Sequence, residues 1–102
     1  MTVKSNISDD YKHLSIKVEK RFDFSQHQHF RDAYIEHTEE GTEFLLDLSQ
    51  TDYMDSSALG MILLLKDHAE NIGGKIVINK PSEAVNKILE IAQFHRLMTI
   101  VH

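Results

Sequence analysis

Three small polar residues, Asp55, Ser56 and Ser57, stand directly in front of the uncharged segment ALGMILLL. A carboxylate beside two hydroxyls could cap a helix, supply a serine nucleophile or present a serine for phosphorylation. Serine hydrolysis needs a base and an orienting acid beside the nucleophile, and this segment contains neither a histidine nor the Gly-x-Ser-x-Gly turn. We therefore predict that the protein is not an enzyme, and that these residues cap a helix or carry a phosphate.

The segment from Ser56 to about Asn71 has the length and the late polar residues of a helix, and Gly73-Gly74 can end it. On an ideal helix, with about 100° between successive residues, one apolar stripe must face the core. This stripe contains Ala58, Ile62, Leu65, Ala69 and Ile72. A second face mixes leucines with polar residues: Ser56, Leu59, Leu63, Asp67 and Glu70, with Ser57 pointing away from it. Exposed leucines beside charges are typical of protein-contact surfaces, so we expect a partner to bind here with Ser56 at the edge.

The simplest role for this helix entrance is structural, because Asp55 or Ser56 can accept hydrogen bonds from the free amides of the first turn. Capping is compatible with phosphorylation of Ser56. A phosphate there would lie near the positive end of the helix dipole and would add about two negative charges beside Asp55. The fold would then persist while the affinity for a partner changes.

Seven histidines raise the question of a metal site. His27 and His29 are two positions apart, so on a helix their side chains would point about 200° from each other and could not share an ion. His37, His68 and His95 fall in separate predicted elements. We therefore expect surface histidines, no bound metal and no other cofactor.

The first half of the chain alternates predicted strands with a predicted helix. Apolar and polar residues alternate in residues 3–7 and 14–18 around the turn-prone SDDYK, which predicts an opening β-hairpin. Ser25 can cap a helix that continues to about Thr38. The apolar run EFLLDLS, residues 43–49, is typical of a strand buried on both faces.

The second half continues the alternation after the helix that begins at Ser56. The segment KIVIN predicts a strand, and MTIV near the C-terminus can close the sheet. Between them, Pro81-Ser82 introduces a helix with an apolar face made by Ala84, Ile88, Ile91 and Ala92 with Val85 and Leu89. The order predicts an α/β domain: a mostly parallel or mixed sheet of about five strands with helices mainly on one side.

Length and composition limit the classes of function. The 102 residues fit one domain, 1–102, and no apolar run approaches the roughly 20 residues of a membrane span. The N-terminus lacks the order of a secretory signal and cysteine is absent, so we expect a cytoplasmic protein. A net charge of −5 with 11 scattered Lys and Arg disfavours nucleic acid as a partner. A protein or a small ligand is the expected partner.

The stretch LLDLSQTDYMDSSALGMILLLK resembles the signature of STAS domains of the bacterial anti-sigma factor antagonist type. In that signature an apolar strand leads to Asp-Ser-Ser or Asp-Ser-Thr at a strand-to-helix junction. The similarity extends over the opening hairpin, Phe22-Asp23 and the final GGKIVINKPSEAVNKILEIAQFHRLMTIV. One departure is Ala58, where the family usually has glycine; alanine favours helix, so we expect a stiffer helix entrance with an intact acceptor.

The resemblance implies a phosphorylation-controlled partner switch. Ser56 would be the phosphate acceptor, and Asp55, Leu59 and Leu63 would contact partners, with Ser57 beside them in a mainly structural role. An anti-sigma-type serine kinase would bind the unmodified protein and phosphorylate it, and a metal-dependent serine phosphatase would reverse the step. The free protein would be monomeric, and the output would be a sigma factor or another regulator, such as one of biofilm or stress physiology.

A second functional class stays open at this point. The same domain could be a constitutive STAS interaction subunit of a transport or lipid-trafficking assembly. In that case Ser56 would be only a helix cap or a packed hydroxyl.

Overall fold

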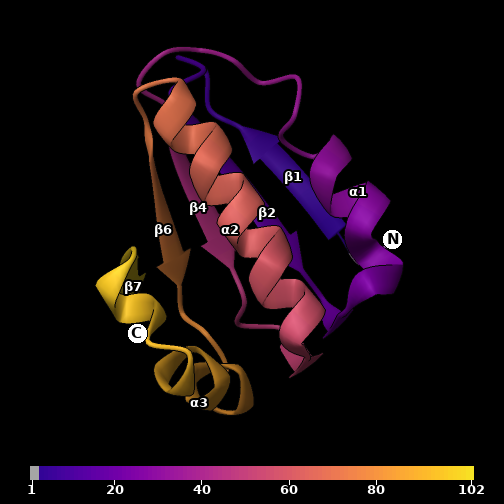
Figure 1. The fold of residues 1–102 in the computed structure, drawn as a ribbon. Helices are drawn as coiled ribbons and strands as arrows, with labels where there is room; N and C mark the ends of the chain where they lie inside the picture. The colour runs from indigo at the N-terminus through magenta and orange to yellow at the C-terminus, as the bar shows by residue number, and fades with distance from the viewer. Residues whose placement is uncertain (1–2) are drawn as a thin grey trace.

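A mixed five-stranded sheet with strand order β1-β2-β4-β6-β7 forms the centre of the protein in the computed structural model, which describes residues 3–102 (Figure 1). Its strands are β1 Val3–Ile7, β2 His13–Val18, β4 Glu43–Asp47, β6 Lys75–Asn79 and β7 Thr99–Val101. β1 and β2 form the expected antiparallel hairpin, and every other neighbouring pair is parallel. The expected mixed sheet of about five strands is confirmed.

A second, two-stranded sheet is absent from the sequence-based prediction. β3 (Lys20–Phe22) pairs in parallel with β5 (Thr51–Met54), and Phe22 lies opposite Met54. Strands of three and four residues are too short to show a hydrophobic period. Because β5 leads directly into Asp55, this small sheet fixes where the following helix begins.

The helices differ in how well the sequence predicts them. The structure contains α1 His27–Asp32, α2 Ser56–Asn71 and α3 Glu83–Ile91, with the short 3₁₀ helices η1 Phe24–Gln26 and η2 Phe94–Arg96. α2 has the predicted bounds. Gly73, with a φ of 68°, follows its end and takes a left-handed conformation that a side chain would disfavour. α3 begins after Ser82, whose hydroxyl accepts a hydrogen bond from the amide of Val85.

The prediction of one long helix over residues 25–38 is wrong. Asp23 rather than Ser25 caps the segment, because its carboxylate accepts a hydrogen bond from the Ser25 amide. The α-helix ends at Asp32, and the following amides bond carbonyls three or four residues earlier as a series of turns. Ala33 and Tyr34 continue the helical spacing from Phe30 beyond the end of α1. The sequence therefore predicts a longer helix than the structure contains.

The core lies between one face of the five-stranded sheet and α2. The side chains of α2 buried there are Ala58, Met61, Ile62, Leu65 and Ala69. They meet the alternate buried residues of β2, β4 and β6. α1 and α2 both lie on this face of the sheet, in front of the strands in Figure 1. The predicted helix coverage mainly on one side is confirmed.

The expectation that the strand in residues 43–49 is buried on both faces is wrong. In β4, Phe44 and Leu46 are fully buried, whereas Glu43, Leu45 and Asp47 are half-buried. In the part of the chain that the structure describes, no helix covers the second face of this strand, because the connections through α1 and α2 pass over the same side. An apolar run at that position thus reflects one packed face and one partly open face.

The apolar face predicted for the last helix is also partly wrong. Val85 and Leu89 are buried, but Ile91 is 83% exposed and Ala84 is exposed as well. α3 packs against β5. It lies at the lower end of the molecule in Figure 1, below β6. Within residues 3–102, none of the helices is long and apolar enough to cross a membrane.

Candidate functional site

The entrance of α2 is capped by Asp55. Its backbone is extended, with φ −120° and ψ −175°, and its Oδ1 accepts a hydrogen bond from the Ser57 amide at 3.0 Å. The Ser57 hydroxyl donates to the same oxygen at 2.5 Å. The sequence leaves Asp55 or Ser56 as the cap, and the structure assigns the cap to Asp55.

Ser56 and Ser57 have different environments. Ser57 is half-buried and its hydroxyl is engaged with Asp55. Ser56 is exposed, and within residues 3–102 its hydroxyl has no hydrogen-bond partner. The hydroxyl that is accessible to another molecule is therefore that of Ser56, and the expected structural role of Ser57 agrees with its hydrogen bond.

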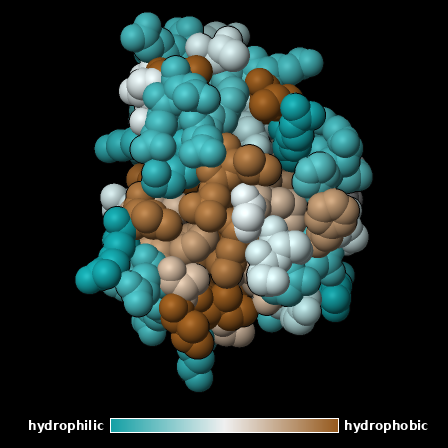
Figure 2. Space-filling view, in the orientation of Figure 1, coloured by the Kyte–Doolittle hydropathy of each residue, from teal (hydrophilic) through white to brown (hydrophobic). Residues whose placement is uncertain are grey.

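The solvent-facing side of α2 extends the site along the helix. Leu63 and Leu64 are 38% and 53% exposed, and Gly60 is exposed between them and Ser56. Leu59, which the helical wheel places on this face, is half-buried and packs against the core. Figure 2, in the orientation of Figure 1, shows apolar surface over the middle of this side and hydrophilic surface toward the C-terminal end of α2. The helical wheel does not place Leu64 on this face, but Leu64 is more exposed than Leu63.

β5, which delivers Asp55 and Ser56, is held on two sides. The buried Thr51 donates its hydroxyl to the Val18 carbonyl at 2.7 Å, and the Ser82 hydroxyl donates to the Thr51 carbonyl at 2.6 Å. One hydrogen bond ties β5 to the main sheet and the other ties it to the start of α3. Both bonds are made by Thr51, the first residue of β5, so the start of the strand that leads to Ser56 is fixed before any partner binds.

A second carboxylate, Asp23, lies at the end of the neighbouring strand β3. Its side chain accepts hydrogen bonds from the amide and the hydroxyl of Ser25 and pairs with Arg21, Nε to Oδ2, at 3.2 Å. The hydrogen bonds from Ser25, and then Arg21, lower the pKa of Asp23 below its usual value. The Arg21 guanidinium also lies 4.4 Å from the ring centre of Tyr53, its neighbour on β5. The outer face of the small sheet is therefore an ordered polar and aromatic surface beside Ser56.

The expectation that all the histidines lie on the surface is wrong for two of them. His68 Nε2 is 2.7 Å from the His37 carbonyl, and His37 Nε2 is 2.9 Å from the Thr42 hydroxyl, both in partly buried positions. The rings pack among Tyr34 and Phe44. These histidines join α2 to the loop before β4, and no group of three metal-binding side chains occurs within residues 3–102.

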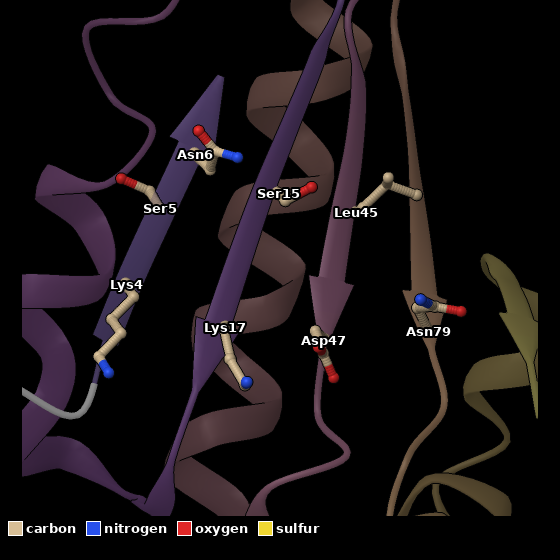
Figure 3. Close-up of a pocket in the computed structure, with 8 residues that line it drawn as sticks. All are labelled: Lys4, Ser5, Asn6, Ser15, Lys17, Leu45, Asp47 and Asn79. Atoms are coloured by element: carbon tan, nitrogen blue, oxygen red, sulfur yellow. The ribbon is translucent and has the colours of Figure 1, made fainter. Parts of the chain in front are cut away.

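The uncovered face of the main sheet carries a shallow groove of about 270 Å³ that the sequence does not predict. One cross-strand row runs through it: Lys4, Lys17, Asp47 and Asn79. Figure 3 looks onto these side chains with α2 behind the strands. The groove therefore opens on the opposite face of the sheet from Ser56.

Comparison with known proteins identifies the class of domain that this fold and junction define. The family model of the STAS domain matches residues 3–102, and the chain belongs to the STAS domain family. A STAS-domain containing protein from Pseudomonas aeruginosa strain UCBPP-PA14 is 42% identical over 100 residues, which cover 98% of this chain and 99% of that protein. The resemblance drawn from the Asp-Ser-Ser junction is confirmed at the level of the family.

Solved structures share the fold at low sequence identity. The unphosphorylated form of the anti-sigma factor antagonist SpoIIAA superposes with a TM-score of 0.80 at 16% identity, covering 98% of this chain and 88% of that one. A protein from Thermotoga maritima gives the same TM-score at 20% identity, with 98% and 86% covered. The phosphorylated form of SpoIIAA from Bacillus gives 0.68 at 15% identity, with 98% and 91% covered. The fold is therefore that of the anti-sigma factor antagonists.

Proposed function

We propose that the protein is a partner-switching regulator in which Ser56 accepts a phosphate. In its unmodified form it binds an anti-sigma-type serine kinase through Ser56 and the exposed side of α2, and phosphorylation releases it. Its role is that of a binding protein without catalysis of its own. The fold shared with SpoIIAA, which has been solved in unphosphorylated and phosphorylated forms, supports this assignment.

The observation that carries the proposal is that α2 does not need the Ser56 hydroxyl. Asp55 accepts the hydrogen bond of the first-turn amide and also engages Ser57. Ser56 is exposed one residue after the cap, where its backbone is fixed and its Oγ is accessible. A serine whose hydroxyl does not stabilise the fold, at a rigid and solvent-facing position, is suited to modification.

The chemistry requires two enzymes from outside the chain. The kinase joins the γ-phosphorus of ATP to Ser56 Oγ, the bond from that phosphorus to ADP breaks, and the serine proton leaves. A metal-dependent serine phosphatase then adds water to the phosphorus and releases inorganic phosphate and the free hydroxyl. Both reactions need only an accessible Oγ on this chain.

The phosphate would act on binding more than on folding. It would lie at the N-terminal end of α2, where the helix dipole favours negative charge. It would also add about two charges beside Asp55, on the helix that carries the exposed Leu63 and Leu64. Charge placed at the edge of an apolar contact must be desolvated when a partner binds, which weakens the complex.

The constitutive-module alternative makes Ser56 a cap or a packed hydroxyl, and the structure gives the capping role to Asp55. The two functions differ in their response to substitution. We expect Ser56→Ala to keep a serine kinase bound and Ser56→Asp to release it, with Asn71→Asp, at the exposed far end of α2, as the control for added charge. Tagged variants purified from the producing cells, with bound kinases quantified by mass spectrometry, provide the measurement. Retention of the same kinase by Ser56→Asp and wild type would contradict the switch.

A further inference from the structure

The parallel strands β3 and β5 are each followed by a turn of the same kind. Asp23 and Asp55 both have extended backbones, and each accepts hydrogen bonds from the amide and hydroxyl of the serine two residues later. Phe22 and Met54, the residues before them, are paired across the two strands. Neighbouring strands lie about 5 Å apart, so the two turns stand side by side.

The central residues of these turns are Phe24 and Ser56, two positions beyond the last paired residues. Ser56 is exposed, and Phe24 is 67% exposed, whereas Phe22, the last residue of β3, is completely buried. The Phe24 ring stacks on His27, with ring centres 5.0 Å apart, at the surface of η1 and α1. An exposed aromatic side chain thus occupies the position in the turn after β3 that Ser56 occupies in the turn after β5.

We propose that Phe24 is the apolar anchor of the surface on which the Ser56 kinase docks, an inference that rests on the function proposed above. An enzyme whose cleft reaches Ser56 Oγ must also cover the neighbouring end of β3, because the two turns are adjacent. The kinase that fits this surface has an apolar pocket beside its catalytic cleft, and burial of the Phe24 ring there stabilises the complex.

The surroundings of Phe24 have the composition of an interaction surface. Tyr53 is 43% exposed and lies under the Arg21 guanidinium on the outer face of the β3–β5 sheet. Tyrosine, phenylalanine and arginine are the residue types enriched at the centres of protein interfaces. The proposed docking surface therefore includes the exposed leucines of α2, Phe24 and the outer face of the small sheet.

The chain offers a matched control in Ile91. Its side chain is 83% exposed, more than that of Phe24, but it lies on α3 and outside the β3 turn. If any exposed apolar side chain promoted kinase binding nonspecifically, Ile91→Ala would weaken docking as much as Phe24→Ala. If position beside Ser56 matters, only Phe24→Ala has an effect.

The test is the initial rate of thiophosphate transfer to Ser56. Purified full-length variants are incubated with extract of the producing cells, from a strain lacking the gene, and with ATPγS, because thiophosphoserine resists phosphatases. Peptide mass spectrometry measures the modification at Ser56, with Ser56→Ala as background. We expect Phe24→Ala to lower the rate about ten-fold or more, Phe24→Tyr to restore most of it, and Ile91→Ala to match wild type.

The outcomes separate this inference from the function on which it rests. Equal rates for wild type and Phe24→Ala would overturn the anchor and leave the switch standing. No transfer to Ser56 of the wild-type protein would overturn both. Unchanged thermal unfolding of Phe24→Ala, expected for an exposed ring, ensures that a lost rate reports docking and not folding.

Discussion

In each of the turns Asp23-Phe24-Ser25 and Asp55-Ser56-Ser57, the aspartate has an extended backbone and accepts hydrogen bonds from the amide and hydroxyl of the serine. The two turns support elements of different length. The first caps η1, a 3₁₀ helix of three residues, and the second caps α2, a helix of 16 residues. The central position is exposed in both, so the fold does not dictate its side chain. The comparison teaches that capping and surface chemistry are carried by separate residues, and that Phe24 and Ser56 are free to serve binding.

The largest expected effect contrasts Phe22, the last residue of β3, with Phe24, the first residue of η1. Phe22 is fully buried and lies 4.9 Å from the Phe30 ring, centre to centre. We expect Phe22→Ala to lower the free energy of unfolding by about 3 to 5 kcal/mol and Phe24→Ala to change it by less than about 0.5 kcal/mol. Urea unfolding of both variants checks this, and a similar loss for the two would contradict the assigned burial.

The second largest expected effect is the difference in stability between variants of the two capping carboxylates, Asp55 and Asp23. Asp55→Ala leaves the first turn of α2 uncapped, and we expect a loss of about 1 to 2 kcal/mol in the free energy of unfolding. Asp23→Ala affects η1 and the pair with the exposed Arg21, so its loss in the free energy of unfolding should be smaller than that of Asp55→Ala. Equilibrium unfolding in urea at neutral pH compares the variants directly. A larger loss for Asp23→Ala would show that the stability contribution of a cap does not follow the length of the helix it supports.

Substitution of the two serines after Asp55 should change the stability by smaller amounts, with the larger loss at Ser57. Ser57→Ala removes the hydroxyl that bonds Asp55, and we expect a loss of about 0.5 to 1.5 kcal/mol. Ser56→Ala should stay within about 0.5 kcal/mol of wild type in the same unfolding experiment, because its hydroxyl has no partner within residues 3–102. A clear loss for Ser56→Ala would return that serine to a structural role.

The smallest expected effect is a pH dependence from Asp23. The folded protein lowers its pKa from the usual 3.8, chiefly through the Ser25 hydroxyl, so the charged form stabilises the fold above that pH. This contribution is lost as the pH falls through the lowered pKa. The stability difference between wild type and Asp23→Asn should therefore be constant at neutral pH and shrink below about pH 3.8. A stability difference that grows as the pH falls would contradict the lowered pKa of Asp23.

Much of the fold is predictable because its signals are local. The hairpin, α2, β6 and the cap of α3 follow from alternation, helix length and the positions of Gly73 and Ser82. β3 and β5 escape prediction because their pairing joins segments about 30 residues apart and each is too short to show a pattern.

The candidate site is predictable in its centre and not at its border. Asp55 and Ser56 stand out by residue type beside an apolar helix, and the wheel correctly places Leu63 at the surface. Leu64 is missed because its exposure depends on how α2 is rotated on the sheet. Phe24 is missed because an aromatic residue before a helix predicts burial, and only the β3–β5 register places it next to Ser56.

The most direct test of the account is intact mass and peptide mapping of the protein purified from its own cells, with and without phosphatase treatment. The account predicts one phosphate, confined to Ser56 and removed by the phosphatase, with Ser57 unmodified. Absence of phosphate under every growth condition, or a phosphate on Ser57 instead, would contradict the assignment of Ser56 as the acceptor.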